Sequence, residues 1–508
     1  MNRKSSLLVA FGVTGVVVAV GCTDGDSNLS GGGDGGSTAS ASSSGAGSGG
    51  KNATAGGNSG TTQTPPSDAG AAGTRNEGGA TAEGGATAEG GAAGGTAKLE
   101  PLAGYTLFAM EDAETNFSST QLIDMDGNVV QTWNVGGIPS KLLPGGDLIG
   151  TVGVFPNDYD AVTLEQVSWA GDVKWSFSNW EKAADDTFGS RQHHDFQREG
   201  NPVGYYAPGQ DFLANGNTVV LAHSLRTVPP VRDDALDDDV IYEVDSSGAL
   251  KRTVWKGADH IADFGFDEAA LADIRTRAPG TTLEWLHGNS LSLVGKNHWF
   301  DEGHTEFNPN NIVYSSRHAN FVLILSRETG ETVWRIGPDF AGRPEASLGQ
   351  FAGQHNPYLI PSGLPGAGDM IVFDNGGASG YGGPSNTNRY SHTWSRVIEF
   401  NPITMEVVWQ YGAATGPENI YSPYVSNTQR LPNGNTIITV GTSGRIIEVT
   451  PAHEIVWQYQ YVPPTGLSPW VYRSYRIPPE WLPGGVNAAH GKYANWGDLY
   501  PVVAPAAN

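Results

Sequence analysis

The sequence predicts an all-β fold, a six-bladed β-propeller, from two repeated features. A strand, a polar turn and a second strand ending in tryptophan occur six times along the chain, and this pattern is typical of β-hairpins. A second turn sequence precedes most of these hairpins. Two hairpins per repeat make a four-stranded blade, and six such units close a ring.

The six hairpins alternate apolar residues around their turns, as in LIDMDGNVVQTW and IIEVTPAHEIVW. A blade has two apolar faces, so the units must stack, and we expect the tryptophans to pack between neighbours. A pair of β-sandwiches is the alternative, but sandwiches do not repeat one turn and tryptophan signature six times. The strand expected at 104–110 either completes the last blade or begins the first. The tryptophans are Trp133, Trp175, Trp255, Trp334, Trp409 and Trp457.

The second hairpin of a blade is indicated by turn sequences at 143–147, 214–217 and 432–435. They read LPGGD, ANGN and PNGN. Glycine and asparagine adopt the positive φ that such turns need. These turns therefore predict paired strands on both sides of each of them.

Residues 1–21 are typical of a lipoprotein signal peptide. A charged start precedes an apolar run that ends at Cys22, the only cysteine of the chain, and signals of this type are cleaved before a lipidated cysteine. A lipidated Cys22 predicts a membrane-anchored protein of the cell envelope, on the periplasmic or outer-surface side. The alternative is an uncleaved anchor with an incidental cysteine.

Residues 22–98 consist almost entirely of small and polar residues, including the near-repeat EGGATAEGGATAEGGAA. This composition predicts a disordered linker. Residues 99–508 then form the propeller. The formal net charge of −24 argues against nucleic acid as a partner, because nucleic acid requires clustered Lys and Arg.

Histidines open three successive repeats, at His194, His287 and His355. The strands that follow them end in polar residues as well. If the repeats are related by rotation, these side chains meet at one end of the channel. Such a set can bind an anionic, multi-oxygen group, with neutral imidazole as nucleophile or base. The other members of the set are His223, Arg317, His318, Asn289, Asp374 and Asn375.

The runs WLHGNSLSL, NIVYSSRHANFVLILSRETGETVWRIG, QHNPYLIPSG, MIVFDNGG and QRLPNGNTIITVG resemble the arylsulfotransferase family of exported six-bladed propellers. The resemblance implies sulfuryl transfer from an aryl sulfate to a phenol, without a nucleotide sulfate donor and with no cofactor or metal. It assigns His287, His355 and Arg317 as catalytic residues. His194, His223, His318, Asn289, Asp374 and Asn375 are then expected to bind substrate.

The chain departs from the family pattern, and we interpret it as a divergent member. The histidine expected to take the sulfuryl group where the sixth blade opens is missing, because residues 421–427 read YSPYVSN. An arginine expected after FDNG is displaced, the nearest being Arg389 and Arg396. Either another residue such as His355 is the nucleophile, or the transfer reaction is lost.

Two other functions stay open. A non-catalytic propeller could bind a small anionic or aromatic ligand, or another envelope protein, at the same place. A metal-dependent hydrolase or lyase would need carboxylates that converge with the histidines. The acidic stretch at 233–239 is expected to be a solvated turn rather than a calcium site, and the segment 301–306 carries ligand residues without a recognised spacing.

Overall fold

The structure is a computed structural model that describes residues 100–110, 119–154, 160–178, 190–213, 215–377, 379–381, 391–491 and 493–501. All of these belong to one compact unit. The predicted signal peptide, Cys22 and the linker lie outside the described residues, as does Arg389. Within the described part of the chain, no helix is long and apolar enough to cross a membrane.

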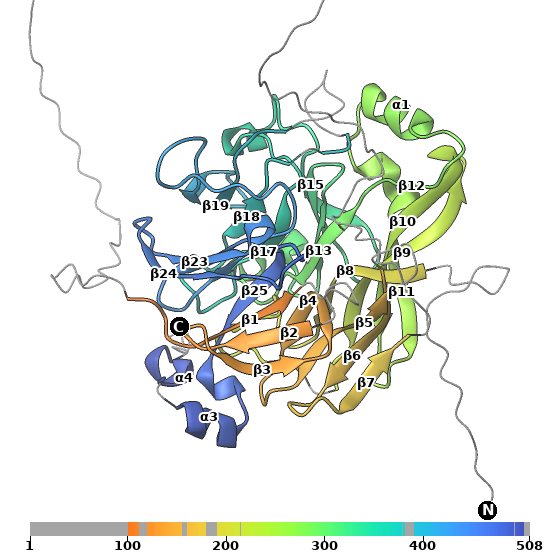
Figure 1. Ribbon diagram of the computed structural model, residues 1–508. Helices are drawn as coiled ribbons and strands as arrows, with labels where there is room; N and C mark the ends of the chain where they lie inside the picture. Colours follow the sequence, from red (N-terminus) through yellow and green to blue (C-terminus); the bar gives the residue numbers. More distant parts are fainter. Residues whose placement is uncertain are drawn as a thin grey trace, which may run out of the picture. The chain divides into compact units, whose positions relative to one another are not determined.

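Strands dominate the structure, and they form separate sheets that are arranged around a common centre (Figure 1). Three sheets are made of consecutive antiparallel strands. The first holds β13 (Gly288–Leu293), β14 (Ile312–Ser316), β15 (Phe321–Leu325) and β16 (Thr332–Ile336). The second holds β17 (His355–Leu359), β18 (Met370–Asp374), β19 (Arg396–Phe400) and β20 (Val407–Tyr411). The third holds β21 (Asn427–Arg430), β22 (Thr436–Val440), β23 (Arg445–Val449) and β24 (Ile455–Gln460).

A fourth four-stranded sheet joins the two ends of the described chain. Its order is β25 (Val471–Ile477), β1 (Tyr105–Met110), β2 (Ser119–Ile123) and β3 (Val129–Trp133). β1 pairs antiparallel with both β2 and the C-terminal β25. The strand predicted near residues 104–110 is β1, and it lies between β25, the last strand that the structure describes, and β2. Figure 1 shows the orange β1 beside the blue β25.

The remaining strands form one nine-stranded sheet. Two runs of antiparallel strands, β4 to β7 and β8 to β11, are joined by a single residue pair, Ala161 with Gln192. The short β12 adds to β10 in parallel. The strands are β4 (Gly136–Leu142), β5 (Leu148–Val154), β6 (Ala161–Val167), β7 (Val173–Phe177), β8 (Ser190–Arg198), β9 (Thr218–Val228), β10 (Arg232–Val244), β11 (Leu250–Lys256) and β12 (Leu283–Glu284).

The first strand of each run faces the centre. β4 contacts β8, β8 contacts β13, β13 contacts β17, β17 contacts β21, β21 contacts β25, and β25 contacts β4. The inner strands therefore form a closed ring. The fold is all-β and propeller-like. Four of its sheets are separate, and the rest of the ring is the nine-stranded sheet.

All six predicted tryptophan hairpins are present. They are β2–β3, β6–β7, β10–β11, β15–β16, β19–β20 and β23–β24. The middle strands such as β15 and β19 are buried throughout, whereas the outer strands such as β16 and β20 have exposed residues. The turn at 432–435 joins β21 to β22, and Gly434 has φ +89°.

The tryptophans lie between neighbouring sheets, as predicted. The Trp175 indole N–H donates to the backbone oxygen of Asp245 in the β10–β11 turn at 3.3 Å. The same bond recurs from Trp334 to Pro402 O, from Trp409 to Pro451 O and from Trp457 to Met125 O, at 2.9–3.2 Å. Trp334, Trp409 and Trp457 therefore tie an outer strand to the hairpin turn of the next sheet, and Trp175 ties the first run of the nine-stranded sheet to the second.

The helices are short and peripheral. Helix α1 contacts the extended part of β10, which projects beside it (Figure 1). The acidic stretch at 233–239 belongs to β10, so the expectation of a solvated turn there was wrong: Asp238 and Asp239 are fully buried. The helices are α1 (Glu268–Thr276), α2 (His298–Asp301), α3 (Gly484–His490) and α4 (Trp496–Leu499).

Candidate functional site

The inner strands of three successive runs are irregular where their histidines lie. Strand register shifts between Gln192 and Phe196 in β8, at the start of β13 and at the start of β17. His194, His287 and Asn356 have φ of +53°, +50° and +52° at these places. Non-glycine residues adopt this region rarely, and such strain concentrates at functional sites. β-bulges of this kind turn side chains out of the regular alternation.

Three of the predicted histidines form one cluster. The His287 ring centroid lies 4.6 Å from that of His194 and 4.8 Å from that of His318. His318 directs Nδ1 to the Glu284 backbone oxygen at 3.1 Å, so this nitrogen carries the proton. The structure therefore brings together rings from β8, from the residue before β13 and from the residues after β14.

His355 is held by Asn375, which follows β18. The His355 Nδ1 lies 2.7 Å from Asn375 Oδ1 and 3.0 Å from the Gly353 oxygen. Both partners are acceptors, because the Asn375 Nδ2 group donates to the oxygens of Ser422 and Val425. Nδ1 of His355 therefore carries the proton, and Nε2 keeps its lone pair.

Two arginines lie near these histidines. Arg317 is close enough to His287 and His355 to lower the pKa of both imidazoles. Arg473, on β25, donates to Asp195 Oδ2 at 2.7 Å and to the Asn289 oxygen at 2.7 Å. The site thus combines guanidinium groups with imidazoles in a buried setting.

Burial lowers the pKa of three imidazoles. The pKa of His355 lies well below 6.5, because burial disfavours its charged form and Arg317 adds to this. Burial and the neighbouring His287 hold the pKa of His194 well below its usual value. The pKa of His287 is lowered mainly by burial, although the carboxylate of Glu284, 2.6 Å from its Nδ1, opposes the shift.

Two predicted residues have structural partners. Asn289 donates through Nδ2 to the Gln354 oxygen at 2.6 Å. The Asp374 carboxylate accepts from Arg396 Nε at 2.9 Å and from the Ala352 N–H at 2.9 Å. Arg396, the displaced arginine of the sequence pattern, is therefore paired with Asp374.

His223 lies in a carboxylate environment. Its Nδ1 is 2.9 Å from Asp160 Oδ2, and its Nε2 is 3.4 Å from Glu284 Oε1. Burial alone would lower the pKa of His223, but Asp160 and Asp237 together raise it well above 6.5. Glu284 is therefore shared between His223 and the cluster around His287.

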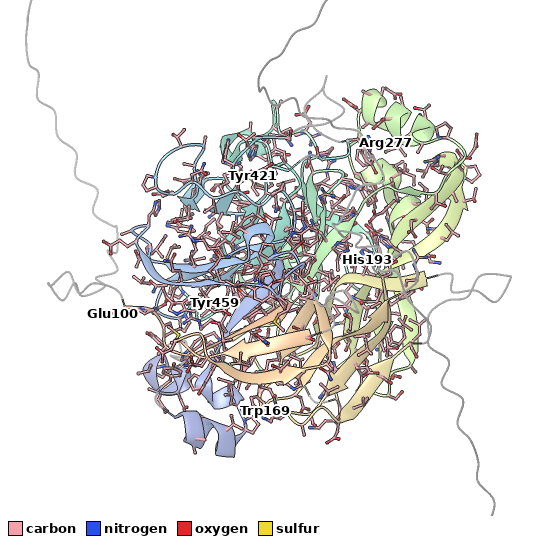
Figure 2. The ribbon with its side chains drawn as sticks, in the orientation of Figure 1. Glu100, Trp169, His193, Arg277, Tyr421 and Tyr459 are labelled. Carbon is pink, nitrogen blue, oxygen red and sulfur yellow. The ribbon has the colours of Figure 1, made fainter. Side chains whose placement is uncertain are left out.

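His193 and Asp239 complete this carboxylate region. The His193 ring stacks on that of His223 with centroids 3.6 Å apart, and its Nε2 lies 3.0 Å from Asp239 Oδ1. Figure 2 labels His193 close to β8 and β9. Two groups of possible metal ligands result, His193 with His223 and Asp239, and Asp160 with His223 and Asp237.

Sequence reasoning missed this carboxylate region. The cue was the acidic stretch that contains Asp237 and Asp239, which reads as a turn because no apolar alternation marks it as a strand. Asp160 lies 63 residues from His223 in the sequence, and Glu284, although it is close to His287 along the chain, is far from His223, which it also meets. Arg473 had no sequence signal either, because ring closure by β25 brings it to the site.

Comparison with solved structures finds similar folds at low identity. A protein of unknown function from Bacteroides caccae is 12% identical, with 74% of this chain and 99% of that chain covered and a TM-score of 0.38. Virginiamycin B lyase from Staphylococcus aureus is 8% identical, with 68% and 78% covered and a TM-score of 0.32. Apo AztD from Citrobacter koseri is 10% identical, with 74% and 98% covered and a TM-score of 0.32.

No curated protein sequence matches the chain. The sequence profile of a family described as Arylsulfotransferase (ASST) matches residues 208–462. That range runs from just before β9 to just after β24 and contains His223, His287, Arg317 and His355. Since the match covers half of the 508 residues, this chain belongs to the arylsulfotransferase family.

Proposed function

We propose that this protein transfers a sulfuryl group from a phenolic sulfate ester to a phenolic acceptor at the histidine cluster. The observation that carries the proposal is the gathering of buried imidazoles from successive sheets beside Arg317. The family match gives the reaction class. An arginine neutralises the sulfuryl oxygens, while a neutral imidazole is free to attack sulfur.

His355 is the proposed nucleophile, in place of the histidine that the sixth repeat lacks. Its Nδ1–H is held by Asn375 and the Gly353 oxygen, which leaves Nε2 unprotonated. Nε2 attacks sulfur, the S–N bond forms, and the bond between sulfur and the aryl oxygen breaks. The phenol acceptor then attacks the same sulfur and releases the imidazole.

His287 is the proposed acid and base. In the first step the ring starts protonated beside the Glu284 carboxylate and gives its proton to the leaving phenolate, and in the second step the neutral ring takes the proton of the acceptor phenol. The Glu284 carboxylate, 2.6 Å from Nδ1, stabilises the charged form of the ring when it carries that proton. His194, His318, His223, Asn289, Asp374 and Asn375 are assigned to substrate binding or to the support of groups that bind it.

The architecture and location that we propose follow the same resemblance. Six blades are supported by the six tryptophan hairpins and by the closed path of inner strands.

Anchoring through a lipidated Cys22 places the site outside the cytoplasm, in the cell envelope. Release of the protein from the membrane fraction by Cys22→Ser is the expected result, and retention of the variant would contradict the anchor.

Nitrophenol release from 4-nitrophenyl sulfate, with phenol as acceptor, tests the proposed reaction. We expect acceptor-dependent release by the wild type and a loss of at least about 100-fold in His355→Ala, because the nucleophile is removed. His453→Ala is the matched control, since His453 lies on the β23–β24 turn and pairs with Glu418. Equal loss in both variants would contradict the role of His355.

A binding protein without catalysis is the second candidate function. It is favoured by the sixth repeat, where Asn375 binds the backbone of Ser422 and Val425 in the stretch that lacks the expected histidine. In that case, calorimetry would detect binding of 4-nitrophenyl sulfate to the protein, yet no acceptor phenol would be converted to its sulfate ester.

A further inference from the structure

His223, on β9, has carboxylates on both sides of its ring. Its Nδ1 lies 2.9 Å from Asp160 Oδ2 and 3.9 Å from Asp237 Oδ2. Its Nε2 lies 3.4 Å from Glu284 Oε1 and 3.5 Å from Asp239 Oδ1. The side chain is 5% exposed, so solvent screens these charges weakly. Anions at both nitrogens stabilise the imidazolium form, which carries a proton on each of them.

The neighbouring His193 does not share a ligand with His223. The two rings are stacked with 10° between their planes and 3.6 Å between their centroids. Stacked rings direct their nitrogens side by side rather than toward a common point, so the pair does not fit one metal ion. His193 Nε2 lies 3.0 Å from Asp239 Oδ1 instead. His223 is therefore a cation in a network of carboxylates.

Arg191 fixes the carboxylates on the Nδ1 side of this network. Its Nε donates to Asp160 Oδ2 at 2.8 Å, and its Nη2 donates to Asp237 Oδ2 at 2.8 Å. Arg191 and His223 are also paired residues of β8 and β9. Strand pairing thus sets the position of the His223 ring, and Asp160 holds its orientation.

The Nε2 side of the network leads to the proposed acid and base. One oxygen of Glu284, Oε1, lies 3.4 Å from His223 Nε2 and 2.6 Å from His287 Nδ1. The Glu284 side chain is 35% exposed, so packing alone does not fix its carboxylate. The charged ring of His223 restrains the carboxylate at the place where it meets His287.

We propose that His223 is a positioning residue of the transfer site, whose charged ring holds the Glu284 carboxylate against His287. Glu284 keeps a proton on His287 Nδ1, and Nε2 of the same ring exchanges the second proton with the leaving and accepting phenols. His223 itself does not touch substrate, because both of its nitrogens contact carboxylates. The catalytic part of this inference rests on the proposed function, whereas the charge of His223 is measurable without it.

Donors with different leaving groups test the role of His223. Phenolate needs a proton as it leaves, because phenol has a pKa of about 10, like tyrosine, whereas 4-nitrophenolate leaves readily without one. His223→Gln removes the charge and keeps an amide donor. With 4-methylphenol as acceptor, its kcat/KM for phenyl sulfate should fall about 100-fold, the size of a general-acid contribution, and that for 4-nitrophenyl sulfate less than about 10-fold.

His193→Gln is the matched control. His193 is as buried as His223 and stacks on it, but its Nε2 contacts Asp239. The ratio of the two kcat/KM values should stay that of the wild type in this variant, whatever its total activity. An equal loss for both donors in His223→Gln, or the same preferential loss in both variants, would overturn the positioning role while the transfer reaction stands.

NMR of the histidine ring nitrogens tests the charge without substrate. The signals that disappear in His223→Gln should be those of a doubly protonated ring in the wild type at pH 7, because, against the effect of burial, Asp160 and Asp237 raise the pKa of His223 well above 6.5. A neutral His223 would overturn this inference whether or not transfer occurs. A wild type that transfers no sulfuryl group would contradict the proposed function and the catalytic role together, even with His223 charged.

Discussion

The residue that most directly links structure to chemistry is His355. Its Nδ1 contacts two acceptors, Asn375 Oδ1 and the Gly353 oxygen, and its pKa is held well below 6.5 by burial and by Arg317. Sequence reasoning selected this histidine and Asn375, because both begin or end strands at equivalent places in a repeat. It could not select Asp239 or Glu284, whose roles arise only when β10 and β12 pair.

The low pKa of His355 makes stability depend on pH. In the unfolded chain its pKa is about 6.5, so below that pH the unfolded state binds a proton that the native state refuses. Stability is therefore intact above about pH 6.5 and falls as the pH drops toward the native pKa. Arg317, His287 and Arg473 face His355 and oppose its protonation.

Urea unfolding between pH 7.5 and 5.5 measures this effect. The urea concentration at the wild-type midpoint should decrease as the pH is lowered. In His355→Gln this decrease should be smaller, because one titrating group is removed. His194 and His287 contribute in the same direction, so a residual slope is expected. An unchanged slope in His355→Gln would contradict the assignment.

At the scale of elements, two kinds of hydrogen bond join neighbouring sheets, those of the tryptophan indoles and those of side-chain amides. Only the tryptophans were recognisable in the sequence. The recurring tryptophans predicted packing between neighbours, and four indoles bond to the next turn. The inner strands are joined by side-chain amides instead. Gln429 Nε2 donates to the Arg476 oxygen at 3.0 Å, and the Arg476 N–H donates to Gln429 Oε1 at 2.6 Å.

Gln429→Leu should destabilise the protein strongly. It leaves a buried N–H and a buried carbonyl of β25 unpaired, and each such group costs about 1–3 kcal/mol. Gln131→Leu is the control, since Gln131 lies partly exposed on outer strand β3, where it donates to the Trp169 oxygen and accepts from the exposed Thr132 N–H. Chemical denaturation of both variants should show a clearly larger loss for Gln429→Leu, and equal losses would count against this link.

At the scale of the whole molecule, the repeat predicted the hairpins and the propeller-like closure, because turn chemistry and alternation are local signals. The merging of β4–β11 into one sheet was not predictable, since a single pair between Ala161 and Gln192 causes it. The carboxylate region was not predictable for the same reason. Its members come from β8, β9, β10, β12 and the residue before β6, and they meet only in the folded ring.

The balance of products from 4-nitrophenyl sulfate tests the central claim, sulfuryl transfer at this site, most directly. With increasing phenol, nitrophenol release should rise, and mass spectrometry should find one phenyl sulfate for each nitrophenol released. Release that is indifferent to phenol, with inorganic sulfate as the product, would contradict transfer and identify a hydrolase. No release with any phenolic acceptor would contradict catalysis and leave a binding protein.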